Sequence, residues 1–355
     1  MTGKPRIWMR SEVRATERRA PIVPADAGLL TDLGIAVTVE ESSHRVFPIA
    51  EYAAAGCAIA KEGSWTGAPA DQYIVGLKEL PDGAAPLMHR HVYFGHAYKR
   101  QQGSAELLGR FAAGGGELLD LESLADADGR RLAAFGYWAG YVGAALAVLS
   151  ATGHLTSPLR PLPKETLDSE LRRARRADPP RVLVVGALGR CGSGARDALA
   201  MAGIAPTCWD VDETRDLDRT ALLGHDILVN TVFTTSPITP FVRSADLGDP
   251  ARRLTLVADV TCDVTSSCNA LPIYESATSW QEPVRRLCQG PRPLDIIAID
   301  NLPSLLPKEA SVAFSAQLVP HLMELGTAAP TWQRCVLAFR KACHSIGIEG
   351  EKCDV

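Results

Sequence analysis

The sequence lacks an excess of charge of either sign. Lysine and arginine together number 37 against 41 aspartates and glutamates, so the net charge is −4 at neutral pH. A general DNA- or RNA-binding protein would need a basic face that neutralises phosphates. We therefore expect no nucleic-acid partner, although a pocket with a few arginines could still bind a small anionic substrate.

The sequence also lacks a hydrophobic run long enough to cross a bilayer. The most apolar stretch, Phe135–Leu149, has 15 residues, whereas a membrane-spanning helix needs about 20. The first residues, MTGKPRIWMRSEVR, contain no apolar segment of the kind that a secretory signal has. We expect a cytoplasmic protein with no membrane partner.

Cysteine is sparse, and its spacing is not that of a metal site. The nine cysteines are scattered and include no CxxC pair, which argues against a disulfide scaffold and against a structural zinc site. The histidines do not follow the H-x-x-x-H helical spacing of a catalytic zinc site either. The sequence therefore predicts free thiols in a reducing compartment and no metal.

What is present is a repeated alternation of strands and helices. With 355 residues, of which 46% are hydrophobic and 22% charged, the chain is long enough for about two globular domains. Short apolar runs suggest strands at 5–9, 35–40, 73–77, 92–94, 181–187, 207–211, 226–231, 254–259 and 295–299. Helical patterns lie between many of them, which favours parallel sheets. We predict an α/β protein with two Rossmann-like, doubly wound domains and an active site in the cleft between them.

The domain boundaries are predicted from a change in amino-acid composition near Phe135. There a helix rich in glycine and alanine begins, which suits a junction where backbones pack closely. A helical tail also remains after the second strand series ends. We therefore expect a discontinuous substrate-binding domain, 1–135 plus 319–355, and a dinucleotide-binding domain at 136–318.

A glycine-rich turn is the strongest site signal in the residues themselves. A buried strand leads into Gly186, Gly189 and Gly192 at the start of a helix, and Asp210 follows 21 residues after Gly189. Such a turn directs backbone N–H groups and a helix N-terminus at a pyrophosphate, and the acid can bind a ribose 2′-hydroxyl. We infer NAD binding; the alternatives are a merely tight strand–helix turn and a solvated acid at Asp210. An acid repels the extra phosphate of NADP, although Arg215 is near in sequence.

Two residues within the turn belong to the same predicted cofactor site. Arg190 and Cys191 lie between the second and third glycines. A helix start would stabilise a thiolate at Cys191. Because no histidine is near it in sequence, we interpret this cysteine as a spacer rather than a nucleophile.

Candidate acid–base groups follow two apolar runs of the first domain. Lys78 and Glu79 come just after the run at 73–77, at the carboxyl end where α/β clefts lie. Lys78 could be a general base or could hold a carboxylate, and the plain alternative is a surface ion pair with Glu79. His96 follows the run at 92–94 and could shuttle protons. The alternative is a buried structural histidine, and His89 and His91 compete from what reads as a more polar loop.

Paired arginines are candidate carboxylate ligands, because a guanidinium can bind a carboxylate through two hydrogen bonds. Three pairs stand out: Arg18-Arg19, Arg130-Arg131 and Arg252-Arg253. Most arginine pairs are solvated surface, and we interpret Arg252-Arg253 in that way.

These residues resemble a known family. The chain is similar to the NAD-dependent, L-lysine-forming saccharopine dehydrogenases, which are related to alanine dehydrogenase and to the NAD-binding subunit of transhydrogenase. The matching segments follow the family's order over nearly the whole chain: Glu17–Pro24, Gly76–Pro81, Phe94–Lys99, Asp120–Glu122, Gly129–Gly136, Gly186–Ala195 and Ile299–Ser311.

The resemblance implies a reaction in lysine biosynthesis. Saccharopine, a secondary amine that joins lysine to a glutarate skeleton, loses hydride to NAD, and the resulting imine is hydrolysed to L-lysine and 2-oxoglutarate. In the family, the lysine matched by Lys78 accepts the proton of the secondary amine. The histidine matched by His96 handles protons during imine hydrolysis.

The resemblance also implies roles around this pair. Glu79 and Glu122 match acids that tune the basicity of the two catalytic groups. Arg19 and Arg131 match arginines that bind substrate carboxylates, and Asp300 matches an acid beside the nicotinamide end of the cofactor.

Two other hypotheses remain open at this point. One is a related opine-type or alanine dehydrogenase-like enzyme with another carbonyl partner, and the other is a non-catalytic NAD-binding module that kept the fold. Retention of both Lys78 and His96 argues against the second. We expect small-molecule substrates and a monomer or weak oligomer.

Overall fold

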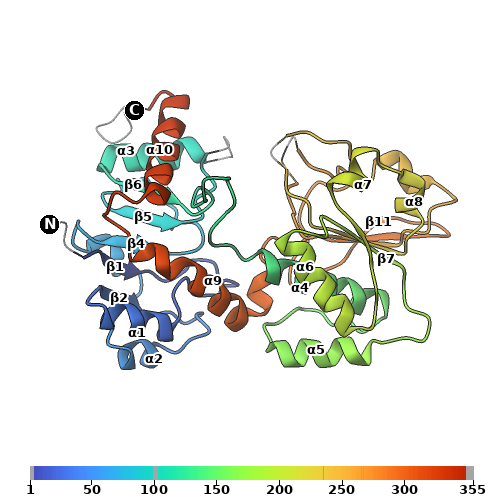
Figure 1. Ribbon diagram of the computed structural model, residues 1–355, viewed down its shortest axis with the longest axis horizontal. Helices are drawn as coiled ribbons and strands as arrows, with labels where there is room; N and C mark the ends of the chain where they lie inside the picture. The colour runs from blue at the N-terminus through green and yellow to red at the C-terminus, as the bar shows by residue number, and fades with distance from the viewer. Residues whose placement is uncertain (1–3, 99–102, 235, 265, 267, 349–355) are drawn as a thin grey trace. The chain divides into compact units, whose positions relative to one another are not determined.

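The computed structural model describes residues 4–98, 103–234, 236–264, 266 and 268–348 (Figure 1). Lys99, at the end of one family motif, lies outside these described residues, as does Cys353. The chain divides into two compact units: unit 1 is Met1–Ala134 with Ala310–Val355, and unit 2 is Phe135–Glu309.

Unit 1 is built on a six-stranded sheet that is parallel throughout. Its strands are β1 (Arg6–Met9), β2 (Ala36–Glu40), β3 (Ala58–Ala60), β4 (Tyr73–Val75), β5 (Arg90–Tyr93) and β6 (Glu117–Asp120). Its helices are α1 (Pro24–Asp32), α2 (Ile49–Ala54), the short 3-10 helix η1 (Ser64–Gly67), α3 (Ser104–Gly114), most of α9 (Pro307–Leu322) and α10 (Pro330–Ser345).

The strand order of unit 1, β3-β2-β1-β4-β5-β6, reverses direction between β1 and β4. Loops that leave the carboxyl ends of two such strands diverge and open a crevice, which is where doubly wound sheets bind ligands. The segments after β1, β4, β5 and β6 all leave this edge of the sheet.

Unit 2 contains a second six-stranded sheet, of order β11-β12-β10-β9-β7-β8. Its strands are β7 (Val182–Val185), β8 (Thr207–Trp209), β9 (Ile227–Asn230), β10 (Leu256–Asp259), β11 (Arg285–Cys288) and β12 (Leu294–Ile297). Its helices are α4 (Gly136–Ala151), α5 (Lys164–Arg173), α6 (Arg190–Met201), α7 (Val211–Arg215), α8 (Arg219–Leu223), η2 (Ser244–Gly248) and η3 (Leu302–Leu305). Only the β11–β12 pair among these described strands is antiparallel.

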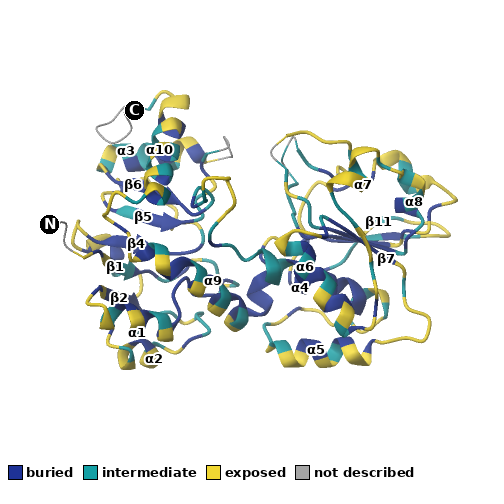
Figure 2. Ribbon diagram, in the orientation of Figure 1, coloured by how far each residue is buried: buried dark blue, intermediate teal, exposed yellow. Residues whose placement is uncertain are grey.

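The sheet of unit 2 is covered on both faces, which is why its strands are continuous apolar runs. Val182, Val184 and Val229 pack with α4, α5 and α6 in one core. Leu183 and Val185 point to the opposite face, against α8 and the loops around residues 241–274. Figure 2 shows this central sheet buried, with exposed residues on the outer sides of the helices. The predicted α/β, doubly wound fold class is therefore confirmed.

Unit 1 takes up the chain again at Ala310, earlier than the expected 319. The cause lies in the first turns of α9. Ser311 accepts a hydrogen bond from the Ala20 backbone N–H at 2.9 Å, and Ser315 accepts one from the Val23 N–H at 3.0 Å. These two serines attach α9 to the loop between β1 and α1, so only the start of the helix belongs to unit 2.

Three strands were not predicted. β3 (Ala58-Ile-Ala) has three residues and two of them are exposed, β6 (Glu117-Leu-Leu-Asp) begins and ends with acids, and β11 begins with two arginines. Short or polar edge strands carry too little hydrophobic pattern for recognition. Among the described residues, no helix combines the length and the apolar character that crossing a membrane would require.

The close packing of α4 on α6 generates a stability prediction. A Cβ atom on Gly140 would lie 1.8 Å from the backbone oxygen of Cys191, so Gly140→Ala must force the two helices apart. We expect a loss in the free energy of unfolding of about 1–3 kcal/mol or more. Gly109→Ala in α3 is the matched control, because a Cβ there meets nothing within 4 Å; it should be neutral or stabilise by up to about 1 kcal/mol.

Urea denaturation of the two variants checks this prediction. Equal midpoints for Gly140→Ala and the wild-type protein would contradict the packing described for α4 and α6.

Candidate active site

Lys78 lies in the loop that follows β4, and a buried carboxylate fixes the backbone of this loop. Glu12, in the loop after β1, accepts hydrogen bonds from the backbone N–H groups of Leu77 at 2.7 Å and Lys78 at 2.9 Å. Glu12 is 5% exposed. Lys78 itself is half-buried. The loop therefore has a defined conformation before any substrate is present.

Arg10 binds the backbone carbonyl groups of the same loop, whereas Glu12 binds its N–H groups. Its guanidinium donates hydrogen bonds to the backbone carbonyls of Lys78 and, at 3.3 Å, Glu79. It also forms an ion pair of 3.3 Å with Glu12. A Cβ on Gly76 would lie 2.6 Å from this guanidinium, so glycine is needed where the arginine passes. Burial raises the pKa of Glu12, and the charge of Arg10 opposes that rise.

Glu79 forms an ion pair, although its partner is not Lys78. Arg14 binds the Glu79 carboxylate with both prongs of its guanidinium, at 2.8 and 3.0 Å. Partial burial alone would raise the pKa of Glu79, but the hydrogen bonds and charge of Arg14 outweigh burial and lower it. The alternative considered for Lys78 was a surface ion pair with Glu79. In the structure the ion-pair partner of Glu79 is Arg14 instead.

His96 lies in the loop after β5 and is held by a carboxylate. Its Nδ1 is 3.1 Å from Oε1 of Glu122, which lies in the loop after β6. The imidazole is 47% exposed, so His96 is not a buried structural histidine. Its backbone has a φ of +49°, an uncommon conformation for a residue with a side chain. Strain of this kind often occurs where a side chain must be aimed at a site.

The loops that carry Lys78 and His96 are side by side. The Phe94 N–H donates to the Leu77 carbonyl at 3.2 Å, which extends the pairing of β4 and β5 beyond the strands. The Leu121 N–H donates in the same way to the Tyr93 carbonyl at 3.0 Å. Lys78, His96 and Glu122 therefore leave the same edge of the sheet on three adjacent loops.

Asp120, the last residue of β6, joins two of these loops. Its Oδ1 accepts a hydrogen bond of 2.9 Å from the Glu122 N–H, and its carboxylate also accepts one from the Gly95 N–H. Burial is the main cause that raises the pKa of Asp120 to about 6, and the charge of Glu122 adds to it. The two backbone hydrogen bonds and the charge of His96 act in the opposite direction. Asp120 is thus a positioning residue beneath the His96–Glu122 pair.

The two predicted carboxylate-binding arginines differ in their surroundings. Arg131 is exposed, on the turn that pairs Ala125 with Arg131 after β6. Arg19 is 4% exposed, and both prongs of its guanidinium bind the Glu17 carboxylate, at 2.8 and 2.5 Å.

The competing histidines do not lie on a polar loop, contrary to expectation. His91 is inside β5 and fully buried, packed edge-on against the rings of Trp65 and Phe111. Burial lowers the pKa of His91 well below its usual value, so the ring stays neutral. His89 is 1% exposed, and its Nε2 lies 2.9 Å from the Ala68 carbonyl oxygen. Both are core residues.

The interpretation of Arg252 as a solvated residue was also wrong. Arg252 is 2% exposed, and its guanidinium donates to the backbone carbonyls of Leu247 at 3.1 Å and Arg292 at 2.6 Å. It holds loops of unit 2 together and has no place in a substrate site. Arg253, by contrast, pairs with Asp226 at 2.9 Å on the surface.

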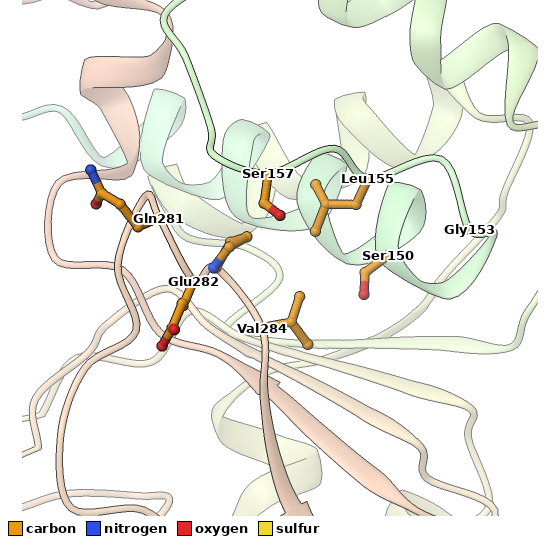
Figure 3. A pocket seen from close by; sticks show the side chains of 8 residues that line it. Ser150, Gly153, Leu155, Ser157, Gln281, Glu282 and Val284 are labelled. Carbon is orange, nitrogen blue, oxygen red and sulfur yellow. The ribbon is translucent and has the colours of Figure 1, made fainter.

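Two hollows are candidate sites. One, of 330 Å³ in unit 1, is lined by Glu79, Tyr93, His96 and the start of α3. The other, of 520 Å³, lies in unit 2 beside the end of α4 (Figure 3). It is lined by Ser150, Gly153, Leu155, Ser157 and Gln281–Val284. None of these lining residues is basic or was predicted as a site residue, so we assign the candidate site to the edge of the unit 1 sheet.

In unit 2 the glycine turn follows β7, at the point where the strand order reverses between β7 and β9. Gly186 has a φ of +80°, and a Cβ there would lie 2.7 Å from Thr231 Oγ1. Gly189 is the N-terminal cap of α6. A Cβ on Gly192 would lie 2.2 Å from the Gly186 oxygen, so Gly186 and Gly192 each have a steric reason, whereas a Cβ on Gly189 would make only an ordinary contact of 3.4 Å. The exposed backbone at this helix start fits a pyrophosphate.

Arg190 and Cys191 form the first turn of α6. Arg190 is exposed, whereas Cys191 is half-buried and packs against α4, where a Cβ on Gly136 would lie 3.1 Å from its Sγ. This packing agrees with the interpretation of Cys191 as a spacer.

Asp210 follows β8 and reaches the glycine turn. Its Oδ2 accepts a hydrogen bond of 2.9 Å from the Leu188 N–H, and its Oδ1 accepts one of 2.9 Å from the Val211 N–H. The second bond caps α7, so Asp210 is more than a solvated loop acid. Arg215, the residue that could favour NADP, pairs with Asp212 at 3.1 Å.

Asp300 is exposed and lies after β12, at the same carboxyl edge of the unit 2 sheet as the glycine turn. The neighbouring loop, after β10, is ordered by the buried Asp259, which accepts hydrogen bonds from Asn230 at 2.9 Å and Tyr274 at 2.7 Å. Among the residues that the structure describes, no group of three or more His, Cys, Asp or Glu side chains could hold a metal ion.

Four residues of the candidate site were not predicted as site residues from the sequence: Arg10, Glu12, Arg14 and Asp120. A signal for the first two was present, because charged residues directly after the apolar run at 5–9 fall at the carboxyl edge of the sheet. Asp120 was named only as the start of the family segment Asp120–Glu122, without a role, since β6 itself was not predicted.

Comparisons with known proteins agree with this geometry. The family model of the alanine dehydrogenase/PNT N-terminal domain matches residues 8–142. Two solved structures share the fold: the transhydrogenase from Sinorhizobium meliloti, with a TM-score of 0.65 at 16% identity over 94% of this chain and 97% of that one, and an L-alanine dehydrogenase, with a TM-score of 0.66 at 15% identity over 95% and 94%.

Curated relatives are much closer in sequence. The chain is 41% identical over 353 residues to the saccharopine dehydrogenase (NAD(+), L-lysine-forming) of Schizosaccharomyces pombe, covering 93% of this chain and 96% of the relative. It is 42% identical over 355 residues to the enzyme of the same name from Neurospora crassa, covering 94% and 95%. The enzyme of that name from Yarrowia lipolytica is 39% identical over 98% of this chain and 100% of its own length. The chain is therefore an oxidoreductase and belongs to the family of NAD(+)-dependent, L-lysine-forming saccharopine dehydrogenases.

Proposed function

We propose that this protein catalyses the reversible, NAD-dependent oxidative deamination of saccharopine to L-lysine and 2-oxoglutarate. The observation that carries the proposal is the set of proton-handling groups at one edge of the unit 1 sheet, with Lys78 on a fixed loop and His96 paired with Glu122 at 3.1 Å. It occurs in a chain about 40% identical over its length to enzymes named for this reaction.

The residues of unit 2 fit a dinucleotide. The three glycines leave backbone exposed at the start of α6, and the Asp210 carboxylate lies within a hydrogen bond of the same turn. In this proposal the turn binds the pyrophosphate, Asp210 binds the adenosine ribose, and Arg190 and Asp300 lie toward the nicotinamide half. When bound, NAD+ supplies the hydride acceptor.

The residues of unit 1 supply the proton chemistry. Lys78 accepts the proton of the secondary amine as the Cα–H bond gives up its hydride and the C=N bond forms. His96 then takes a proton from the attacking water and returns one to the departing nitrogen, so that the adduct separates into L-lysine and 2-oxoglutarate. Glu122 orients the imidazole through Nδ1. The expected site between the two domains remains a prediction, as the reaction needs the groups of both units at one substrate.

Substrate carboxylates need cationic partners, for which we propose Arg131 and Arg19. Arg131 is exposed, whereas the Glu17 carboxylate holds the guanidinium of Arg19 in one orientation. The rivals are an opine-type or alanine dehydrogenase-like enzyme and a non-catalytic NAD-binding module. Following NADH absorbance with 2-oxoglutarate and a panel of amines separates them: only L-lysine should give rapid oxidation, while pyruvate with ammonia should not.

Replacing the acid–base pair tests the assignment directly. Lys78→Met and His96→Gln should each slow turnover on the order of ten- to a thousand-fold, because each removes a group that transfers a proton. The double variant should lose less than the product of the two single losses, since groups that act as a unit are not additive. Steady-state kinetics measures turnover, and NADH fluorescence titration should give nearly unchanged binding. Wild-type turnover in the double variant would refute the assignment.

Asp210→Ala tests the choice of cofactor. A carboxylate accepts the ribose 2′-hydroxyl but repels a 2′-phosphate, so the wild-type protein should use NADH and hardly use NADPH. The substitution should raise the relative kcat/KM for NADPH. Asp216→Ala is the matched control, because Asp216 is an exposed acid at the end of α7, and it should leave the preference as it was. A wild-type protein that uses both cofactors equally would contradict this role.

Asp120→Asn tests the positioning carboxylate through pH. The pKa of Asp120 is raised from 3.8 to about 6 in the folded state. Its contribution to the free energy of unfolding is therefore full below about pH 4 and is lost as the pH rises through about 6. The stability advantage of the wild-type protein over the variant should shrink between about pH 4 and about pH 6.5 in urea denaturation, the interval between the unfolded and folded pKa values of Asp120.

The pH dependence of turnover is a second test of the role of Asp120. Removing a negative charge beside His96 disfavours the protonated imidazole, so the acid limb of the pH–rate profile should move to lower pH. Asp128→Asn, an exposed aspartate after the same strand, is the control. Parallel pH profiles for the wild-type protein and both variants would exclude the proposed coupling.

A further inference from the structure

Unit 1 contains a pocket of 450 Å³ that the proposed reaction does not use. Its polar floor is the row of first residues of three adjacent strands: Tyr73 of β4, Arg90 of β5 and Glu117 of β6. Lys78, His96 and Glu122 follow the opposite, carboxyl ends of the same strands. The pocket is therefore separated from the candidate active site by the length of the strands, and its volume is in the range of small-molecule sites, about 300–1,000 Å³.

The floor of this pocket presents a carboxylate. Tyr73 is the register partner of Arg90, and Arg90 is the register partner of Glu117. The guanidinium turns away from the acid: it lies 3.9 Å from the centre of the Tyr73 ring and donates a hydrogen bond to the Tyr73 hydroxyl. Glu117 is 9% exposed, and no hydrogen bond or ion pair from the described part of the chain reaches its carboxylate.

The wall of the pocket presents a cation. Trp332, Val336 and Arg340 are spaced four residues apart on α10, so they form one stripe along the helix, and all three line the pocket. The Nε of Arg340 is buried and has no hydrogen-bond partner among the described residues. An unpaired polar atom of a charged group, removed from water, is costly unless a partner is supplied.

Apolar groups complete the enclosure. Trp332 is 4% exposed, and its indole N–H is held by the His321 carbonyl at 2.8 Å, which fixes the ring. Leu119 faces the pocket two residues along β6 from Glu117, and Leu325 and Gly326 close it from the loop before α10. Gly326 has a φ of +77°, and this backbone passes close to the Tyr73 hydroxyl, 3.3 Å from where a Cβ would be.

We propose that this pocket is a second binding site, for a small zwitterion with a short apolar stem. Glu117 binds the ammonium group of the ligand and Arg340 binds its carboxylate, while the stem packs on Trp332 and Leu119. A ligand with only one charge would leave either the acid or the guanidinium without a partner, so both charges are required. The site is independent of the proposed reaction, because none of its residues is shared with the acid–base groups.

The ligand requirement is tested on the unmodified protein by isothermal titration calorimetry. The probes are two zwitterions, L-norleucine with adjacent charges and 6-aminohexanoate with charges at opposite ends, and two singly charged analogues, hexanoate and n-pentylamine. At least one zwitterion should bind with a dissociation constant on the order of 1 mM or below. Both analogues should bind at least about tenfold more weakly. Lack of binding by both zwitterions, or equal binding by an analogue, overturns the proposal.

The location of the bound probe is tested with matched variants. Glu117→Gln and Arg340→Gln should each weaken zwitterion binding at least about tenfold. Glu324→Gln and Lys341→Gln, which remove exposed charges nearby on the same segments, should not. Lys78→Met should also bind the probe as the wild-type protein does. Loss of binding in Lys78→Met would assign the probe to the candidate active site and overturn the proposal, as would wild-type affinity in both pocket variants. Circular dichroism checks that each variant is folded.

Discussion

The candidate site of unit 1 depends on buried carboxylates that accept hydrogen bonds from backbone N–H groups just beyond the ends of parallel strands. Glu12 holds the loop of Lys78 in this way, and Asp120 holds the loops of His96 and Glu122. Where a strand ends, its backbone hydrogen bonds to the neighbouring strand end as well, so the next N–H groups need other acceptors. Side-chain carboxylates used for that purpose fix three adjacent loops without covering them by further backbone, and this leaves the side chains of Lys78 and His96 accessible.

The same carboxylates shape the electrostatics of the site. Asp120 is buried next to Glu122, and burial with a like charge raises its pKa to about 6. It can therefore change charge near the pH at which an imidazole works. Glu12 is compensated by Arg10, and Glu79 by Arg14, so the acids around Lys78 each have an arginine of their own. The Arg10–Glu12 pair is almost wholly buried, so it is costly to disturb, because removing one partner leaves the other buried and unpaired.

In unit 2, glycines shape both the turn after β7 and the packing of α4 on α6. A dinucleotide needs exposed backbone N–H groups at a helix start, and the helix must then pack tightly on its surroundings. Gly186 and Gly192 keep the turn free of side chains, whereas Gly140 and Gly194 let α4 and α6 approach until their backbones touch. Asp210 links the turn to the end of β8. The exposed turn and the helix packing of unit 2 thus depend on the same short glycine-rich segment.

The alternating strands and helices, the glycine turn with its acid, and the placement of Lys78 and His96 after buried strands could be predicted from the sequence, because they depend on local pattern and on the rule that parallel strands end at one edge. The resemblance added Glu122 and assigned roles to Arg19 and Arg131. The pairing of Glu79 with Arg14, the burial of His91 and Arg252, the position of Asp120 beside Glu122 and the entry of α9 into unit 1 at Ala310 became known from the folded chain. Each of these depends on contacts between residues far apart in the chain, and the burial of a charge or the partner of a guanidinium is set by packing that no local pattern records.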